Sequence, residues 1–188
     1  AANIYFDFRP LYGEARLADD LRQWLNGITP ENRLFQRMLV ANALQAEPPL
    51  GWIRTFRTDE DGHGGTLDLK THGTRIFVDA ARAYALAFGF GETNTSQRLR
   101  LAGRHLNLPE QDTAAAVDAY HFLQMLRLRA QRGALEGERT AAGEGDASRP
   151  VPNRIDPYAL NQLDQRMLRE AFRQARALQS RLEQTVGH

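Results

Sequence analysis

The 188-residue chain is 42% hydrophobic and 25% charged, a composition typical of a globular domain that excludes a fibrous or fully disordered protein. Its 24 basic and 23 acidic residues leave a net charge of +1, so bulk charge gives no reason to expect nucleic acid or an anionic membrane as a partner. The lack of cysteine excludes disulfides, cysteine-ligated zinc, iron–sulfur clusters and thiol catalysis. With no signal peptide and no apolar run of about 20 residues, the chain is expected to be cytoplasmic and without a membrane span.

The N-terminal part is predicted to contain one strand and one helix. Residues 4–8 are rich in aromatic and β-branched side chains, which indicates a short strand. The chain enters this strand directly and without Met, so we expect it to be a fragment of a longer protein. A helix is predicted over residues 14–26, ended by Gly27. Its apolar residues recur at steps of three and four, which places them on one stripe: Leu17, Leu21, Trp24 and Ile28.

Most of the remaining chain is predicted to be helical. Thr29 and Pro30 have the pattern of an N-cap and a first helical residue, opening a helix that continues to Leu44. Residues 51–73 are irregular, with a short strand at 52–56 and a polar, glycine-rich turn at 59–65. Further helices are then expected at about 74–88, 95–106 and 110–132.

The C-terminal part is predicted to be a flexible loop followed by a long helix. Residues 133–152 have almost no large apolar side chain and cannot offset the entropy of ordering. Asp156 and Pro157 are predicted to cap a final helix reaching about residue 184. Its expected core stripe is Leu160, Leu163, Met167, Ala171, Ala175, Leu178 and Leu182. The predicted fold is therefore mainly α, an antiparallel helical bundle with a short N-terminal strand.

A stripe of charged residues lies on one face of the predicted helix at 74–88. Arg75, Asp79 and Arg82 are spaced by four and three, so they project from the same side. They could form a structural salt-bridge row, or an arginine pair oriented by Asp79 to hold a phosphate or carboxylate. Lys70 lies just before this helix start, where backbone N–H groups favour anions.

Polar side chains also border the apolar stripe of the next long helix, at Tyr120, Gln124, Arg127 and Gln131. Such groups need partners, so they either hydrogen-bond the backbone of a loop or line a groove. On the last helix an arginine row lies nearly opposite the expected core stripe and is predicted to be solvated: Arg166, Arg169, Arg173 and Arg176.

No self-sufficient catalytic motif is present. The sequence lacks a GxSxG, Walker A or GxGxxG motif, and the five histidines do not have metal-ligand spacing. His63, which lies near Asp59 and Asp61, is predicted to belong to a polar turn rather than to a metal site.

Several short strings, in this order and spacing, resemble a known family. They are Asp68-Leu69-Lys70 with Gly73, Val78-Asp79-Ala80-Ala81-Arg82 with Ala85-Leu86-Ala87, Thr95 with Arg98-Leu99, Phe122-Leu123 with Leu126-Arg127-Leu128-Arg129 and Gln131, Asn153 with Asp156-Pro157, and Leu168-Arg169-Glu170-Ala171-Phe172. The family is the putative nucleotidyltransferase substrate-binding domain, a helical domain related to C-terminal parts of bacterial protein adenylyl- and uridylyltransferases. The resemblance covers about residues 33–183.

The resemblance implies a domain organisation. Residues 1–13 are similar to the tail of a nucleotidyltransferase palm, residues 14–29 would be a connecting helix, and residues 30–188 would be the helical substrate-binding domain with its flexible loop. Palms of this kind are often preceded by CBS or cyclic-nucleotide-binding modules, which suggests bacterial signal transduction. The partners implied are a nucleoside triphosphate and a protein or small-molecule acceptor.

The resemblance also implies that catalysis needs residues beyond this chain. The Gly-Ser motif and Asp-x-Asp pair of a palm are absent, and Asp7 is similar to the third carboxylate that helps hold two metal ions. Asp7 could instead anchor Arg9 at a strand end. We expect Mg²⁺ in the full-length protein, no cofactor in the fragment and no nucleotide transfer by the fragment alone.

From these strings and the polar margins we predict a cationic groove. Its expected residues are Lys70, Arg75, Asp79, Arg82, Arg127, Gln131, Asn153 and Arg154. Such a groove would favour a nucleotide phosphate or an acidic acceptor surface. The alternative is a non-catalytic interaction module that joins sensory domains to a partner.

Overall fold

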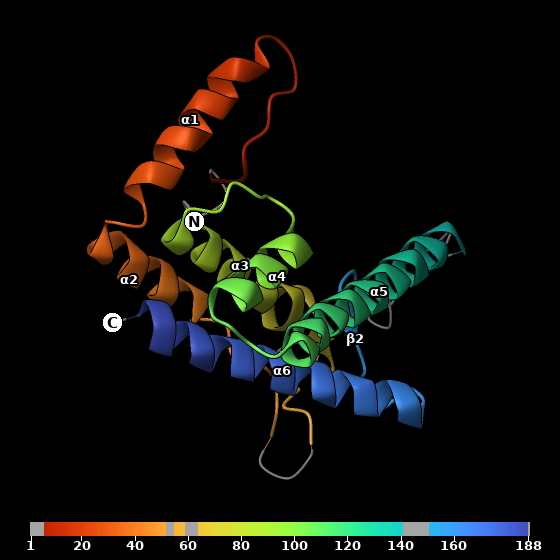
Figure 1. Cartoon of the computed structure of the whole chain (residues 1–188). Coiled ribbons are helices and arrows are strands. Elements are labelled where there is room, and N and C mark those ends of the chain that lie inside the picture. Colours follow the sequence, from red (N-terminus) through yellow and green to blue (C-terminus); the bar gives the residue numbers. More distant parts are fainter. Residues whose placement is uncertain (1–5, 52–54, 59–63, 141–150, 188) are drawn as a thin grey trace. The chain divides into compact units, whose positions relative to one another are not determined.

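The computed structural model describes residues 6–51, 55–58, 64–140 and 151–187, and it describes the side chains of all of these except 137–140. It is 68% helical, with six α-helices and one two-stranded antiparallel sheet among the described residues (Figure 1). The prediction of a mainly α protein is therefore confirmed. No described helix combines the length and apolar character needed to cross a bilayer.

The chain divides into two compact units, each made of segments distant in sequence. Unit 1 comprises Ala1–Gln45, Phe77–Val117 and Ala177–His188, and unit 2 comprises Ala46–Ile76 and Asp118–Arg176. The helices are α1 (Ala15–Ile28), α2 (Arg33–Ala43), α3 (Arg75–Phe88), α4 (Thr95–His105), α5 (Glu110–Thr140) and α6 (Gln162–Val186). Unit 2 also contains β1 (Leu67–Asp68), a π-helical turn (Lys70–Thr74) and β2 (Arg154–Ile155).

The core of unit 1 surrounds α3. Of residues 76–87, all except Val78 are buried, and five of them are alanines, whose small side chains allow neighbouring helices to approach closely. A helix that is buried on nearly all sides is characteristic of a domain centre. Phe77, Tyr84 and Leu182 are the largest fully buried side chains of this core.

The predicted N-terminal strand is not observed in its described part. Phe6 and Asp7 lie in a short 3₁₀ turn, and residues 4 and 5 lie outside the described residues. No described strand is available to pair with this segment, and its side chains make helix contacts instead. Phe6 packs edge-on against Phe35 of α2, with 5.4 Å between the ring centroids.

The junction of α1 and α2 differs from the prediction in two ways. Helix α1 continues through Gly27 to Ile28. Asn32, rather than Thr29, caps α2, because its side-chain oxygen accepts a 3.0 Å hydrogen bond from Phe35 N. The Thr29 hydroxyl instead donates to the carbonyl of Leu86, 2.7 Å away, and so ties the junction to α3.

The apolar stripe of α1 is present as predicted but uncovered. None of the residues of α1 is buried. The four large side chains of the stripe are between 43% and 69% exposed: Leu17, Leu21, Trp24 and Ile28. An isolated helix of 14 residues, the length of α1, is only marginally stable in water. Because no residue of α1 is buried, tertiary packing adds little to its stability.

The sheet of unit 2 pairs two short segments that the sequence did not identify as strands. Leu67 pairs with Ile155 and Asp68 with Arg154. A separate bridge links Leu50 to Phe56, whose ring packs edge-on against Tyr158 and Phe172. Most of the predicted strand at 52–56, and residues 59–63 of the predicted turn, lie outside the described residues.

Helix α5 is longer than predicted, because it ends at Thr140 rather than near Arg132. Residues 133–140 were expected to begin a flexible loop and are helical instead. Gly133 costs about 1 kcal/mol in a helix, but good helix formers surround it and Ala134 is buried. Residues 141–150 of the predicted loop lie outside the described residues.

Helix α6 begins later than predicted and buries a different face at its start. Asn161 accepts a 2.8 Å hydrogen bond from Asp164 N at the helix start, whereas Asp156 accepts from Tyr158 N in the preceding turn. Leu168 and Phe172 are fully buried. Two residues of the predicted stripe are exposed, Leu163 by 65% and Met167 by 43%. Each step of four residues turns the side-chain direction by about 40° around the helix axis. Met167 and Leu163 precede the buried Ala171 by one and two such steps, so they lie progressively further from the buried face.

Replacing Gly89 with alanine is expected to lower the free energy of unfolding by about 1–2 kcal/mol, the cost of a left-handed residue with a side chain. Gly89 ends α3 with φ +71°, and an added Cβ would lie 3.0 Å from the carbonyl oxygen of Asn26. Chemical denaturation followed by circular dichroism measures the change.

The matched control is Gly27→Ala within α1, where an added Cβ meets nothing within 4 Å. Alanine is a better helix former than glycine, so this variant should be at least as stable as the wild type. Equal stability of the Gly89→Ala protein and the wild type would contradict the packing of α3 described here.

Candidate functional site

The candidate site of unit 2 is built around the turn that joins β1 to α3. Asp68, at the end of β1, accepts hydrogen bonds at Oδ1 from the backbone N–H of Lys70 and Thr71, and at Oδ2 from the Thr71 hydroxyl. Thr74 N donates to Leu69 O at 2.9 Å, an i to i−5 bond that defines a π-helical turn. Such turns are rare and are often found at functional sites.

The Asp68 carboxylate is held in its charged form by this turn. Burial raises its pKa, but the hydroxyl and backbone N–H of Thr71 and the backbone N–H of Lys70 together lower the pKa below the ordinary value. The charge of the nearby His72 lowers this pKa as well, so the start of the π turn carries a fixed negative charge whose hydrogen bonds come from backbone N–H groups and the Thr71 hydroxyl.

Helix α5 supplies the polar side chains that face this turn. The pairs Tyr120–Gln124 and Gln124–Arg127 are spaced by four and three, which places their side chains on one helix face. Gln124 Nε2 donates to the Tyr120 hydroxyl at 2.8 Å, and Arg127 Nη1 donates to Gln124 Oε1 at 3.0 Å. Arg127 Nη1 also lies 3.1 Å from the Thr74 hydroxyl, so α5 is bonded to the end of the π turn.

Asn153 is the second partner of Arg127. Its backbone has φ +70°, which asparagine tolerates better than most residues, and its carbonyl accepts a 2.9 Å hydrogen bond from Leu69 N. Asn153 Oδ1 accepts from Arg127 Nε and Nη2, at 3.0 and 2.9 Å, and from Gln131 Nε2 at 2.9 Å. Arg127 thus connects the π turn to the segment that leads into β2.

The charge of Arg127 is not neutralised by any described residue. All its acceptors are amide or hydroxyl oxygens, and no described carboxylate lies in an ion pair with it. A half-buried guanidinium with only neutral partners retains its attraction for anions, because its charge is solvated incompletely and balanced by no neighbour. We call the group Thr74, Gln124, Arg127, Gln131 and Asn153 the Arg127 cluster.

Three other predicted site residues belong to unit 2. Lys70 is exposed, and its amino group has no ion pair with a described residue. Arg154 donates from Nε to the Thr66 hydroxyl at 2.9 Å across the edge of the sheet. Arg75 is exposed at the start of α3. Arg127, Gln131 and Asn153 are therefore brought into contact, while Lys70 and Arg154 lie at the ends of the short segments that surround them.

The remaining predicted residues form a separate cluster within unit 1. Arg82 of α3 is buried and donates to Asp79 Oδ1 at 3.0 Å and to Asp7 Oδ2 at 2.6 Å. Arg98 of α4 is also buried, and its Nη2 lies 2.6 Å from Asp7 Oδ1. Asp7 therefore pairs with Arg82 and Arg98, where the sequence had suggested Arg9 as one alternative. We call these four residues the Asp7 cluster.

Arg98 is the member of this cluster that the sequence interpretation missed. It was noted only as part of a family-like string and was given no role, but it lies four residues before Ala102, which is buried in the same helix. That spacing places both residues on one helix face, so the signal was available. Thr66 and Thr74 were missed because a single hydroxyl in a loop or at a helix start gives no distinctive pattern.

The residues present do not by themselves fit a divalent metal ion. Both carboxylate oxygens of Asp7 are engaged by guanidinium groups. Within the described part of the chain, no group of three or more His, Asp or Glu side chains is placed to hold a metal. The metal role of Asp7 depends on carboxylates from elsewhere and stays a prediction.

The Asp7 cluster predicts an acid-sensitive stability. Burial raises the pKa of Asp7, but the Arg98 and Arg82 guanidiniums together lower it by more than burial raises it. The pKa of Asp7 in the folded chain is therefore below the ordinary value. Because this pKa is lower in the folded state than in the unfolded state, ionised Asp7 stabilises the fold at pH values above the unfolded pKa of about 3.9. This stabilisation is lost as pH falls through the folded pKa. The free energy of unfolding should therefore drop as pH falls below about 4.

Asp7→Asn should remove part of this acid dependence and lower stability at neutral pH by about 3 kcal/mol, the lower end of the range for breaking a buried ion pair. The lower end is expected because Arg82 keeps Asp79, and Arg98 keeps a 2.6 Å hydrogen bond from Nε to Glu92 O. Denaturation of both proteins from pH 3 to pH 7 measures the two effects. Parallel curves for variant and wild type would contradict this account.

One of three comparisons with known proteins identifies the family of the chain. The family model described as "Putative nucleotidyltransferase substrate binding domain" matches residues 33–186, which includes the Arg127 cluster and all of the Asp7 cluster except Asp7. Searches of curated proteins and of solved structures each found no match. The match extends over more than half of the chain, as the resemblance of its short motifs predicted. The chain therefore belongs to the nucleotidyltransferase substrate-binding domain family.

Proposed function

We propose that this chain is the substrate-recognition part of a metal-dependent nucleotidyltransferase of the protein uridylyltransferase and adenylyltransferase kind. In this proposal the Arg127 cluster binds a phosphate group of the nucleotide or an acidic group of the acceptor. Family membership supports substrate binding in general. The observation that carries the finer proposal is the half-buried Arg127 guanidinium, whose described partners are all neutral.

The arrangement around Arg127 suits a phosphate. Three hydrogen bonds from Arg127 and Gln131 converge on Asn153 Oδ1, so the guanidinium plane is fixed before any ligand arrives. A preorganised donor loses less conformational entropy on binding than a mobile one. Lys70 and Arg154 add positive charge at the neighbouring segment ends, and electrostatic attraction of this kind raises the local concentration of anions.

The reaction itself would need residues and Mg²⁺ that this chain does not provide. When bound in a full-length enzyme, paired Mg²⁺ ions would neutralise the triphosphate and activate the attacking hydroxyl. This chain's own contribution in the proposal is to bind and orient the substrate. The prediction that the chain alone transfers no nucleotide is tested by incubating it with labelled nucleotide and candidate acceptors.

Titration calorimetry of the chain with ATP, UTP and inorganic pyrophosphate tests the binding proposal. Charge-assisted hydrogen bonds contribute about 1.5–3 kcal/mol each, so Arg127→Gln should weaken binding of these probes roughly tenfold or more. Lys70→Gln provides a variant without structural cost, since the Lys70 side chain is exposed, and it should weaken binding by a smaller factor.

Arg173→Ala is the matched control, because Arg173 is exposed on α6 and pairs only with Glu170 on the same helix, at 2.9 Å. Its loss should leave binding unchanged. The proposal is wrong if folded Arg127→Gln and Lys70→Gln proteins bind all three probes as the wild type does, or if the wild type binds none of them.

The uncovered stripe of α1 favours a second candidate function, a non-catalytic interaction module. Four large apolar side chains on one helix face remain exposed, and such a surface usually marks a contact with another protein. Under this alternative, replacing Leu21 and Trp24 with serine would abolish partner binding while leaving binding of ATP, UTP and pyrophosphate unchanged.

A further inference from the structure

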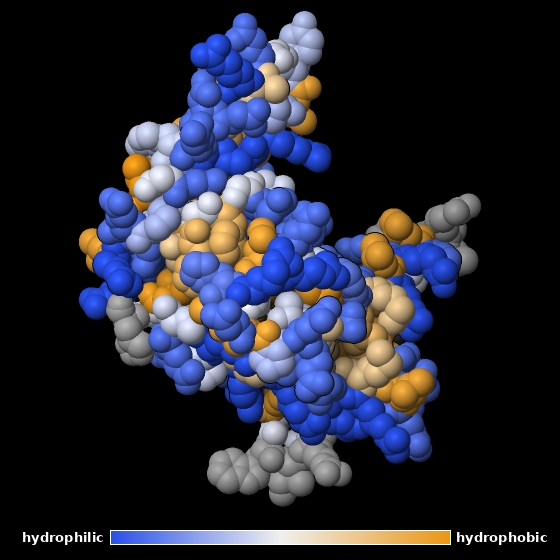
Figure 2. Space-filling model, viewed as in Figure 1, coloured by the Kyte–Doolittle hydropathy of each residue, from blue (hydrophilic) through white to orange (hydrophobic). Residues whose placement is uncertain are grey.

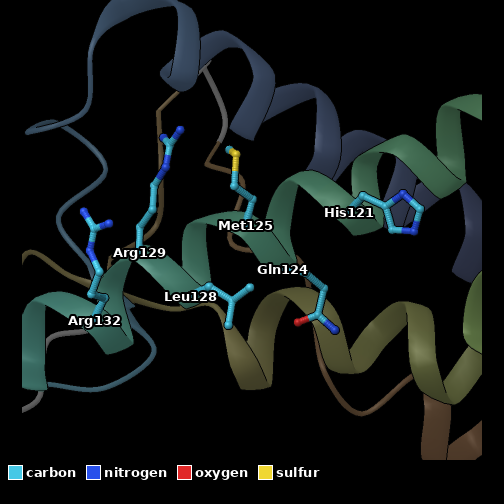
Figure 3. A pocket seen from close by; sticks show the side chains of 6 residues that line it. All are labelled: His121, Gln124, Met125, Leu128, Arg129 and Arg132. Atoms are coloured by element: carbon cyan, nitrogen blue, oxygen red, sulfur yellow. The ribbon is translucent and has the colours of Figure 1, made fainter.

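A shallow pocket of about 380 Å³ lies on the surface of α5 in unit 2. We call it the α5 pocket. All its lining side chains project from α5, as Figure 3 shows: His121, Gln124, Met125, Leu128, Arg129 and Arg132. In this lining, only Gln124 also belongs to the Arg127 cluster. The pocket is thus a surface feature separate from the proposed phosphate contact.

The centre of the α5 pocket is apolar and uncovered. Met125 is half-buried, and Leu128 is 65% exposed. Leu135, two turns further along α5, is exposed as well. In Figure 2, apolar atoms reach the surface over α5 among hydrophilic ones. A row of large apolar side chains without a covering element is a candidate interaction surface.

The charged side chains that line the α5 pocket are two arginines, and each is paired with a carboxylate outside the lining. Its lining includes two arginines and a histidine but no carboxylate. Arg129 pairs with Asp164 at 3.3 Å and Arg132 with Glu136 at 3.5 Å, and in both pairs the arginine is exposed. The Arg132–Glu136 pair is exposed on both sides, and exposed pairs contribute only about 0–1 kcal/mol, so Arg132 can exchange Glu136 for another carboxylate at little cost. Asp164 is only 17% exposed, so Arg129 keeps this pair and offers a partner its remaining N–H groups.

We propose that the α5 pocket docks an acidic amphipathic helix of a partner protein. Leucine-like side chains of that helix would contact Met125 and Leu128, and its flanking Asp or Glu residues would pair with Arg129 and Arg132. Charge complementarity determines this choice of occupant, because an apolar floor with a basic rim matches an apolar stripe with acidic flanks. Apart from Gln124, which belongs to the Arg127 cluster, the residues of this surface have no role in the family match or in the proposed function.

The test uses a synthetic, fluorescein-labelled helical peptide with leucines at positions i, i+3, i+4 and i+7 and glutamates beside them. Fluorescence anisotropy measures its binding to the full chain. Two control peptides have the glutamates replaced by lysine or the leucines replaced by serine. Binding is expected for the acidic leucine peptide alone, and it should weaken as salt is raised, because salt screens exposed charges.

Two variants and two matched controls locate the binding surface. Leu128→Ser and Arg132→Gln should each weaken binding of the acidic peptide, by about tenfold and severalfold respectively. Leu34→Ser replaces a leucine of similar exposure on α2, and Arg176→Gln replaces an exposed arginine of α6 outside the pocket; both should bind normally. Leu128 and Arg132 are exposed, so the variants should fold, and circular dichroism verifies this.

Four results would overturn the proposal. The first three are no binding of the acidic peptide, equal binding of the lysine peptide, and unchanged affinity in folded Leu128→Ser and Arg132→Gln proteins. A fourth is a self-associated wild type that Leu128→Ser converts to monomer in sedimentation, which would assign the pocket to a second copy of the chain. Because Arg127 and Lys70 are unchanged in these variants, their binding of ATP and pyrophosphate reports on the proposed function separately.

Discussion

The burial of α3 is the constraint on which the architecture of unit 1 depends. A helix enclosed on nearly all sides can keep Asp79 and Arg82 only if their charges are compensated locally, since an unpaired charge in the interior costs several kcal/mol. Asp79 compensates Arg82 from the same helix, and Asp7 adds a carboxylate that Arg82 shares with Arg98 of α4. One carboxylate thereby fixes the N-terminal segment to two helices.

The Arg127 cluster performs a different task in unit 2. There the sheet is only two residues long on each side, too short to hold the π turn by backbone pairing alone. Arg127 supplies the missing connections through Thr74 and Asn153. Because these partners are neutral, the arginine organises the turn while keeping its charge. In the Asp7 cluster, by contrast, Arg82 and Arg98 are paired with carboxylates.

Two apolar surfaces are exposed among the described residues, the stripe of α1 and the floor of the α5 pocket. The stripe of α1 lies in unit 1 and the α5 pocket lies in unit 2, and each combines large apolar side chains with nearby charges. Apolar surface exposed to water is unfavourable by about 25 cal/mol per Å², so both surfaces gain free energy when covered. A substrate-binding domain that recognises a protein acceptor would need such surfaces in addition to an anion contact.

The sequence alone determined the helical fold class, the family and most helix positions, because apolar periodicity and short ordered motifs are local properties of the chain. It also selected Arg127, Gln131 and Asn153 as site residues, and the structure shows these three in direct contact. Only the tertiary structure decided the partners. The capture of Asp7 by Arg82 and Arg98 joins residues 75 and 91 positions apart, and the pairing of Leu67 with Ile155 spans a similar distance. Local patterns cannot reveal such contacts, because they depend on which helix faces are buried against one another.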